Sequence, residues 1–206
     1  MDLISIVQLL FIYVVAITIH EYSHAAMSHR LGDPTAAAEG RLTLNPLAHI
    51  DPFVTLALPL MLILIGSPII FGAAKPVPFN PFMVRGGDKG AALVALAGPA
   101  SNLILAVVTA IFLRLVPGLV TAGQGLLVKL LLINIALALF NLIPIPPLDG
   151  SRILYAFMPD PVRRAMEKFE SMGFVAILII FIVVYPVIVP FLRGAISALS
   201  SWLLGV

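Results

Sequence analysis

Two histidines four residues apart, His20 and His24, carry the strongest chemical signal in the sequence, and Glu21 follows the first of them. On a helix, residues i and i+4 share a face, so the two imidazoles can bind one metal ion. Glu21 projects about 100° further round the helix, where it can lie beside the metal without being a ligand. In a zinc hydrolase, a general base for the attacking water occupies this position.

The His-Glu-x-x-His pattern is short, and in soluble proteins it often arises by chance on a polar helix face. Here it follows an apolar run, residues 3–19. In such a run, a carboxylate and two imidazoles cost free energy unless they are paired, bound to a metal or facing a cavity. The setting therefore favours a metal site, and we expect a single Zn²⁺ ion per chain.

The composition indicates that the protein resides in a lipid bilayer. Of its 206 residues, 61% are hydrophobic and 11% are charged, whereas soluble domains carry about 25% charged residues. The mean hydropathy is +1.11. A formal net charge of +2 without a basic patch argues against a nucleic-acid partner. Because the sequence contains 0 cysteines, histidines and carboxylates must hold any zinc.

The apolar runs predict an all-α, multi-pass membrane protein, a helical bundle in one domain over residues 1–206. Its core is expected over residues 1–155, with C-terminal helices over 156–206. The expected elements are a zinc-motif helix over 1–30, apolar helices over 91–116 and 126–142, a charged connector over 158–172, a last clear span over 174–189 and a weak amphipathic tail over 194–206.

Asp149 is the candidate third metal ligand. It follows a proline-rich segment, Pro144 to Pro147, that ends a helix and presents the carboxylate from irregular backbone. An alternative is that Asp149 only caps the next helix. Since the histidine motif lacks a third ligand, the metal interpretation is preferred. His49 and Asp51 are further polar candidates, but a loop and a helix N-cap explain them better.

Together the motifs resemble the site-2 protease family of intramembrane zinc metalloproteases, in its compact bacterial branch. The resemblance covers about residues 1–155. It rests on the histidine motif on a membrane helix, on Ala97-Gly98-Pro99 followed by Asn102, on Leu44 to Leu47 and Ala74 to Pro78, and on the segment from Asn141 to Gly150.

The resemblance implies that His20, His24 and Asp149 bind zinc, that Glu21 is the catalytic base, and that the substrate is a transmembrane protein segment. It also implies a multi-pass protein of a prokaryotic plasma membrane, acting in regulated intramembrane proteolysis. Asn141 is our candidate oxyanion donor, with Lys75 a weaker one. Asn102 is expected to hydrogen-bond to a neighbouring helix.

For the histidines and Asp149 to meet, the helices preceding them should run parallel, with one full crossing between them. Residues 91–116 supply that crossing. Residues 53–71 should therefore enter the bilayer and return on the same side. The flanking segments 41–44 and 73–77 could then pair as a short β-hairpin, and the second could hold an unwound substrate by strand addition.

Two other functions use the same residues. A metal-binding membrane transporter could place the two histidines and Asp149 along an ion pathway, although transporters usually show internal repeats and none is evident. A catalytically silent relative could bind membrane proteins, but the intact ligand set and Glu21 argue against it. The sequence leaves the oligomeric state open.

Overall fold

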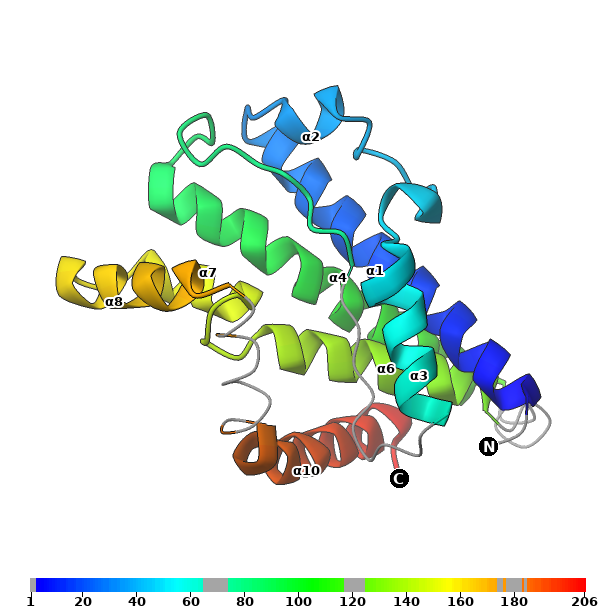
Figure 1. The fold of residues 1–206 in the computed structure, drawn as a ribbon. Coiled ribbons are helices and arrows are strands. Elements are labelled where there is room, and N and C mark those ends of the chain that lie inside the picture. Colours follow the sequence, from blue (N-terminus) through cyan, green and yellow to red (C-terminus); the bar gives the residue numbers. More distant parts are fainter. Residues whose placement is uncertain (1–2, 65–73, 117–124, 174–175, 177–182, 184) are drawn as a thin grey trace.

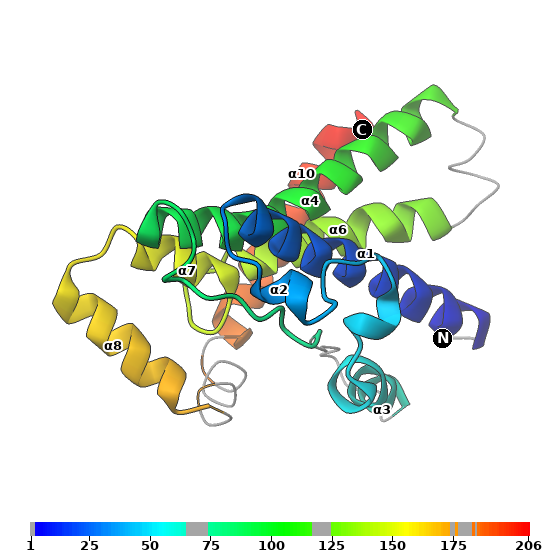
Figure 2. The ribbon, with the colours of Figure 1, turned by 90° about the horizontal axis from the view of Figure 1, so that it is seen from above.

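The computed structural model describes residues 3–64, 74–116, 125–173, 176, 183 and 185–206. Three helices form its centre: α1 (Leu3–Arg30), α4 (Gly87–Leu115) and α6 (Leu126–Asn141). Each of them packs against the other two. Figures 1 and 2 show α1 and α6 running in one direction and α4 in the opposite one, as the sequence argument required.

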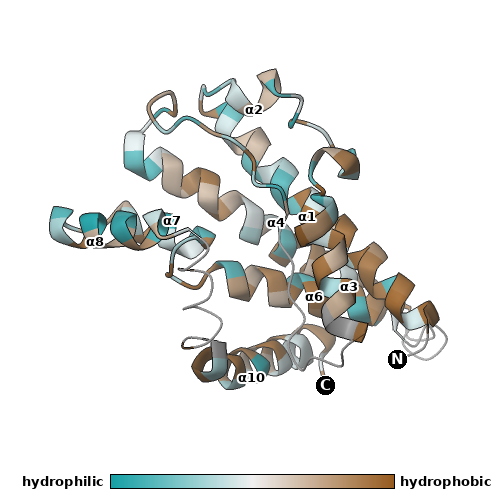
Figure 3. Ribbon diagram, viewed as in Figure 1, coloured by the Kyte–Doolittle hydropathy of each residue, from teal (hydrophilic) through white to brown (hydrophobic). Residues whose placement is uncertain are grey.

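The fold is that of a helical membrane protein. By length and composition, α1, α4 and the Pro186–Leu204 part of α10 (Tyr185–Leu204) could each cross a membrane. Figure 3 shows hydrophobic residues over the N-terminal half of α1 and hydrophilic ones on α8. The shorter described elements are α2 (Thr35–Ala38), η1 (Pro46–Ala48), the π-helical η2 (Pro52–Ala57), α3 (Leu58–Leu64), α7 (Asp149–Tyr155) and α8 (Asp160–Ser171).

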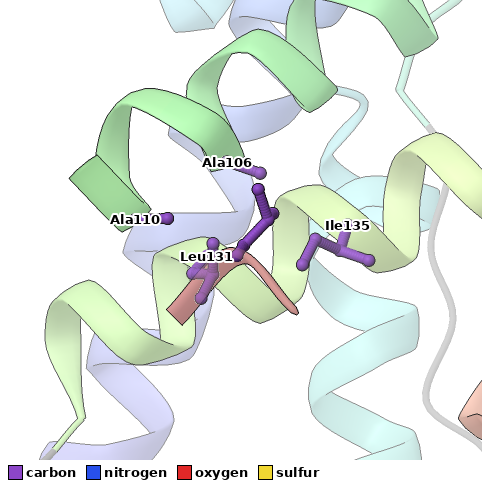
Figure 4. Packing of buried hydrophobic residues seen from close by; sticks show 5 residues of the cluster. Ala106, Ala110, Leu131 and Ile135 are labelled. Atoms are coloured by element: carbon purple, nitrogen blue, oxygen red, sulfur yellow. The ribbon is translucent and has the colours of Figure 1, made fainter. Parts of the chain in front are cut away.

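An apolar cluster holds the second half of α4 against α6 and α10. Ala106 and Ala110 of α4 face Leu131 and Ile135 of α6 (Figure 4), and Leu203 of α10 completes the cluster. The alanines allow the two helix backbones to approach closely, which is how helices associate in a bilayer.

The predicted β-hairpin is not formed by the described residues of its two segments. Residues 41–44 and 74–77 contain no strand, although they do lie close together. The Arg41 side chain joins them by donating to the Lys75 and Pro76 carbonyls. Pro76 and Pro78 have no N–H group, so this stretch has too few donors for a β ladder.

The C-terminal region differs from its prediction. Instead of a weak tail over 194–206, α10 runs from Tyr185 to Leu204. It accommodates Pro186 in its first turn, where a missing N–H is tolerated, and it continues through Pro190. Most of the expected span over 174–189 lies outside the described residues, as do residues 65–71 of the proposed re-entrant segment.

Candidate metal centre

Three electron-pair donors from distant parts of the chain meet in one place. The Nε2 atoms of His20 and His24 lie 3.0 Å apart, and Asp149 Oδ2 lies 3.2 Å from the first and 3.4 Å from the second. A tetrahedral zinc ion with ligands at about 2.0–2.1 Å requires donors about 3.3 Å apart. The spacing of these atoms therefore suits zinc.

A hydrogen-bond chain fixes which nitrogen of His20 faces the site. Asn102 is fully buried, and its Nδ2 donates to the Asn134 side-chain oxygen at 2.8 Å and to the Ala16 carbonyl at 3.3 Å. Its Oδ1 must therefore accept from His20 Nδ1, 2.6 Å away. With the proton on Nδ1, the lone pair of His20 Nε2 points to the other donors.

The same logic applies to His24, whose Nδ1 lies 2.7 Å from the Val94 carbonyl. A carbonyl only accepts, so Nδ1 carries the proton and Nε2 carries a lone pair. Asp149 Oδ2 is buried and has no hydrogen-bond partner. Three buried lone pairs thus converge, and none of the three atoms carries a hydrogen to share with the others. A bound cation would satisfy all three lone pairs.

Gly98 leaves the room that this site needs. A Cβ atom at this position would lie 2.4 Å from His24 Nε2 and 2.6 Å from His20 Cε1. Any larger residue would therefore push the imidazoles out of place. The small residues around Gly98 provide close approach between α1 and α4, and here that approach is part of the site.

Gly150 has a similar role for Asp149. A Cβ there would lie 2.2 Å from the Leu142 carbonyl oxygen. The first turn of α7 can therefore press against the end of α6, which brings Asp149 to the histidines. Asp149 stands in that first turn, and the proline-rich segment connects the two helices. The prediction that irregular backbone presents this carboxylate is wrong at Asp149 itself, which is the first residue of α7 and follows Leu148, the N-cap.

Glu21 lies beside the three donors and is held by the extended segment 74–81. Its Oε2 accepts a hydrogen bond of 3.1 Å from the Val77 N–H. Glu21 is 9% exposed, and it lines the same cavity as the histidines and Asp149. The structure therefore places a carboxylate at the site in addition to the three converging donors.

The cavity has a volume of about 500 Å³ and is mostly apolar. Its walls come from α1, α4, the end of α6, the α6–α7 connection and the extended segment, with Arg152 and Glu170 also contributing. Asn141 belongs to this lining, and its Nδ2 donates to the Leu137 carbonyl at 3.0 Å. An amide nitrogen carries two hydrogens, so one remains for another acceptor.

His49 and Asp51 lie elsewhere, as the simpler interpretation predicted. Asp51 caps η2 by accepting from the Phe53 and Val54 N–H groups. His49 is buried against the loop, with Nε2 2.8 Å from the Thr43 carbonyl. Among the described residues, only His20, His24 and Asp149 form a group that could hold a metal. The Lys75 side chain is exposed.

Sequence reasoning missed three supports of the site. It expected Asn102 to bond to a neighbouring helix but did not identify His20 as the partner. It assigned no role to Arg41 or to the Val77 N–H. A polar residue in an apolar helix was a usable signal for Asn102, whereas backbone donors leave no signal in side-chain types.

The geometry brings together three residues that could hold a metal ion, beside a further carboxylate, in a bundle of apolar helices. Residues 119–185 match the model of peptidase family M50. The chain is 40% identical over 177 residues to "Putative zinc metalloprotease YwhC" of Bacillus subtilis, covering 82% of this chain and 77% of that protein.

It is also 32% identical to "Putative zinc metalloprotease Rip2" of Mycobacterium tuberculosis, over 93% of this chain and 70% of the relative. No solved structure matches. The chain therefore belongs to peptidase family M50, the site-2 protease family. It is a zinc metalloprotease, so the transporter and silent-relative interpretations are not pursued.

Proposed function

We propose that this protein hydrolyses peptide bonds within the transmembrane segments of other membrane proteins. The observation that carries the proposal is the convergence of three buried donors, from His20, His24 and Asp149, beside Glu21 in a bundle of apolar helices. A protease with its reactive groups among such helices acts where a membrane-embedded substrate can reach them. We place it in the cell membrane as a multi-pass protein, with residues 1–206 forming one protease domain.

In this proposal, His20 and His24 offer their Nε2 atoms and Asp149 its Oδ2 to the zinc ion. Asn102 and the Val94 carbonyl hold the imidazoles in the tautomer that this requires. When bound, zinc supplies Lewis-acid activation of a water molecule and of the scissile carbonyl.

Glu21 moves the protons. Because Oε2 is held by the Val77 N–H, Oε1 is the oxygen that accepts the proton of the attacking water. Glu21 then donates this proton to the leaving amine nitrogen, so the carboxylate returns to its starting state.

Asn141 is proposed to stabilise the developing negative charge on the carbonyl oxygen. Its Nδ2 has a second hydrogen beyond the one donated to Leu137, and the residue lines the cavity. A preorganised donor of this kind contributes about 2.7–4 kcal/mol in other hydrolases. Asn141 can stabilise α6 at the same time, because its hydrogen bond to the Leu137 carbonyl uses the other hydrogen of Nδ2.

A substrate helix must unwind before its peptide groups can be attacked, because they are already hydrogen-bonded within the helix. Strand addition to the extended segment is restricted, since the Val77 N–H is bound to Glu21 and its proline neighbours have none. We therefore place the unwound substrate between this segment and the α6–α7 connection. We retain the re-entrant path of residues 53–71 as part of the proposal.

The test is zinc content together with cleavage of single-span proteins in reconstituted liposomes, comparing the native protein with Glu21→Gln. Native protein should cut within the transmembrane segment, with the position read by mass spectrometry. Glu21→Gln should keep its zinc and lose cleavage by about a thousandfold or more, the scale of lost general-base and linked catalysis. Cleavage that survives in Glu21→Gln, or cuts only outside the membrane segment, would contradict the proposal.

A further inference from the structure

Arg41 is a buried cation that the catalytic mechanism does not use. It is 5% exposed, and its guanidinium donates to three carbonyls: Ala48 from Nη1, and Lys75 and Pro76 from Nη2, the last at 3.0 Å. Burying a charge is costly unless it is hydrogen-bonded, and in the described part of the chain both Nη atoms are bonded while the buried Nε has no partner. Such a residue is therefore expected to fix something that a neutral side chain could not fix as well.

The structure that Arg41 fixes is the extended segment 74–81, at the point where it reaches Glu21. The two carbonyls that Nη2 binds belong to the residues directly before Val77, whose N–H holds Glu21 Oε2. The Lys75 N–H donates to the His49 carbonyl at 2.9 Å, which ties the same point to the loop carrying Arg41.

The segment is also fixed further along. The Asn80 N–H donates to Asp33 Oδ2 at 2.7 Å, and the Arg85 N–H donates to the Leu31 carbonyl at 2.9 Å. It therefore follows the C-terminal half of α1, and Figures 1 and 2 show it on the side of α1 and α4 where α2 lies. Between the Arg41 and Asp33 anchors, Val77 is the residue that reaches the catalytic carboxylate.

Proline neighbours make this single contact important. Pro76 and Pro78 have no N–H, so Val77 has the one backbone donor of that triplet. A displacement of the Lys75 and Pro76 carbonyls would carry the Val77 N–H away from Glu21. The forked guanidinium binds two successive carbonyls at once, which a lysine ammonium does with less geometric control.

We infer that Arg41 is a positioning residue for proteolysis: through the Lys75 and Pro76 carbonyls it sets the Val77 N–H that orients Glu21. This inference rests on the proposed function for the reaction itself, but the arrangement of Arg41, Val77 and Glu21 can be tested without it. Arg41 does not contact the three metal donors and should not affect zinc content.

Cleavage kinetics provide the first arm of the test. Arg41→Met should lower kcat by about 10- to 100-fold, the effect of displacing a catalytic group by about 1 Å, with zinc content unchanged. Arg41→Lys should recover part of the rate. Val77→Pro, which removes the N–H, should match Arg41→Met, whereas Val77→Ala, which keeps it, should lose less. Arg164→Met, at an exposed arginine of α8, is the matched control for loss of a positive charge.

The double variant Arg41→Met with Val77→Pro separates positioning from general support of the fold. If Arg41 acts through the Val77 N–H, the double variant should be no slower than either single variant. Losses that multiply would mean independent roles and would overturn the inference.

Amide hydrogen exchange tests the inference without any measurement of cleavage. In zinc-loaded protein, the Lys75 and Val77 amides should exchange at least tenfold faster in Arg41→Met than in native protein, and the Arg164→Met control should not differ. Unchanged protection of these amides would overturn the inference even if cleavage fell. If native protein cleaves nothing but the exchange result holds, the proposed function fails, whereas the arrangement in which Arg41 holds the Val77 N–H against Glu21 stands.

Discussion

The two halves of α4 share a four-residue spacing on one buried face, but the two halves have different roles. One buried face carries, at four-residue intervals, Gly98, Asn102, Ala106 and Ala110. The first two meet α1, where Gly98 makes room for the imidazoles and Asn102 holds His20. The last two meet α6 in a fully apolar cluster.

The comparison teaches that close helix approach is necessary in both halves, but of these four residues only Asn102 adds side-chain hydrogen bonds to neighbouring helices. At the apolar end, a change of one methyl group alters packing alone. At the site end, an added methyl group would displace the imidazoles of His20 and His24, whose Nε2 atoms must converge on one point. Substitutions in the two halves should therefore separate metal binding from stability.

The largest expected effect is that of Gly98→Ala. Its added Cβ would lie 2.4 Å from His24 Nε2, so we expect loss of zinc binding by more than about 100-fold, beyond the usual range for indirect supports of a metal site. Zinc content by mass spectrometry measures it. Gly194→Ala is the matched control, since a Cβ there meets nothing within 4 Å. It should keep its zinc, and native zinc affinity in Gly98→Ala would refute the geometry.

Asn102→Leu should have the next largest effect. It removes the acceptor that holds His20 Nδ1 at 2.6 Å, and loss of such a partner lowers metal affinity by about 10- to 100-fold. A chelator competition titration measures this change. Asn134→Leu, one hydrogen bond further away, should have a smaller effect. Equal affinities for native protein and Asn102→Leu would show that His20 needs no orienting partner.

At the apolar end, Leu131→Ala should reduce stability and leave zinc affinity unchanged. Leu131 is 0% exposed, and in soluble cores this substitution costs about 2–5 kcal/mol. We expect less here, about 1–2 kcal/mol, because the removed groups would otherwise face lipid rather than water. Unfolding in mixed micelles gives the stability. A drop in zinc affinity as large as that of Asn102→Leu would erase the distinction between the two halves.

The smallest effect concerns Asp33, which anchors the extended segment outside the membrane helices. Burial raises the pKa of Asp33, but hydrogen bonds from Thr35, the Asn80 N–H and Ser28 outweigh this and leave the pKa below its ordinary value. Because the folded-state pKa is lowered, the ionised carboxylate stabilises the protein at pH values above the unfolded pKa of about 3.9. This stabilisation is lost as the pH falls through the folded-state pKa.

Native protein should therefore be more stable than Asp33→Asn at neutral pH, and the difference should shrink below about pH 4. Unfolding free energies of both proteins between pH 3 and 7 measure this. A difference that stays constant over the whole range would mean that the Asp33 charge contributes nothing.

Much of this arrangement could be predicted from the sequence, because residue type and spacing determine it directly. The i, i+4 histidines require one helix face, and the apolar runs around residues 3–26 and 91–116 require membrane helices. Asp149 could be predicted as a candidate third ligand because it follows a proline-rich helix end and the two histidines leave a ligand position open.

The remaining features depend on tertiary contacts that side-chain types do not encode. Alternating residues at 41–44 suggested a strand, but the Arg41 side chain, rather than a β ladder, joins the two segments. Prolines near 186 and 190 suggested an interrupted span, yet α10 includes both. The Val77 contact with Glu21 is a backbone contact and could be found only in the structure.

The central claim is that His20, His24 and Asp149 hold one zinc ion together, and zinc bound per chain in Asp149→Ala tests it most directly. Native mass spectrometry should find a single zinc in native protein and in Glu21→Gln, but weak or no binding in Asp149→Ala. The fold of Asp149→Ala should be intact, as judged by its helical content. Zinc held as tightly by Asp149→Ala as by native protein would contradict the account.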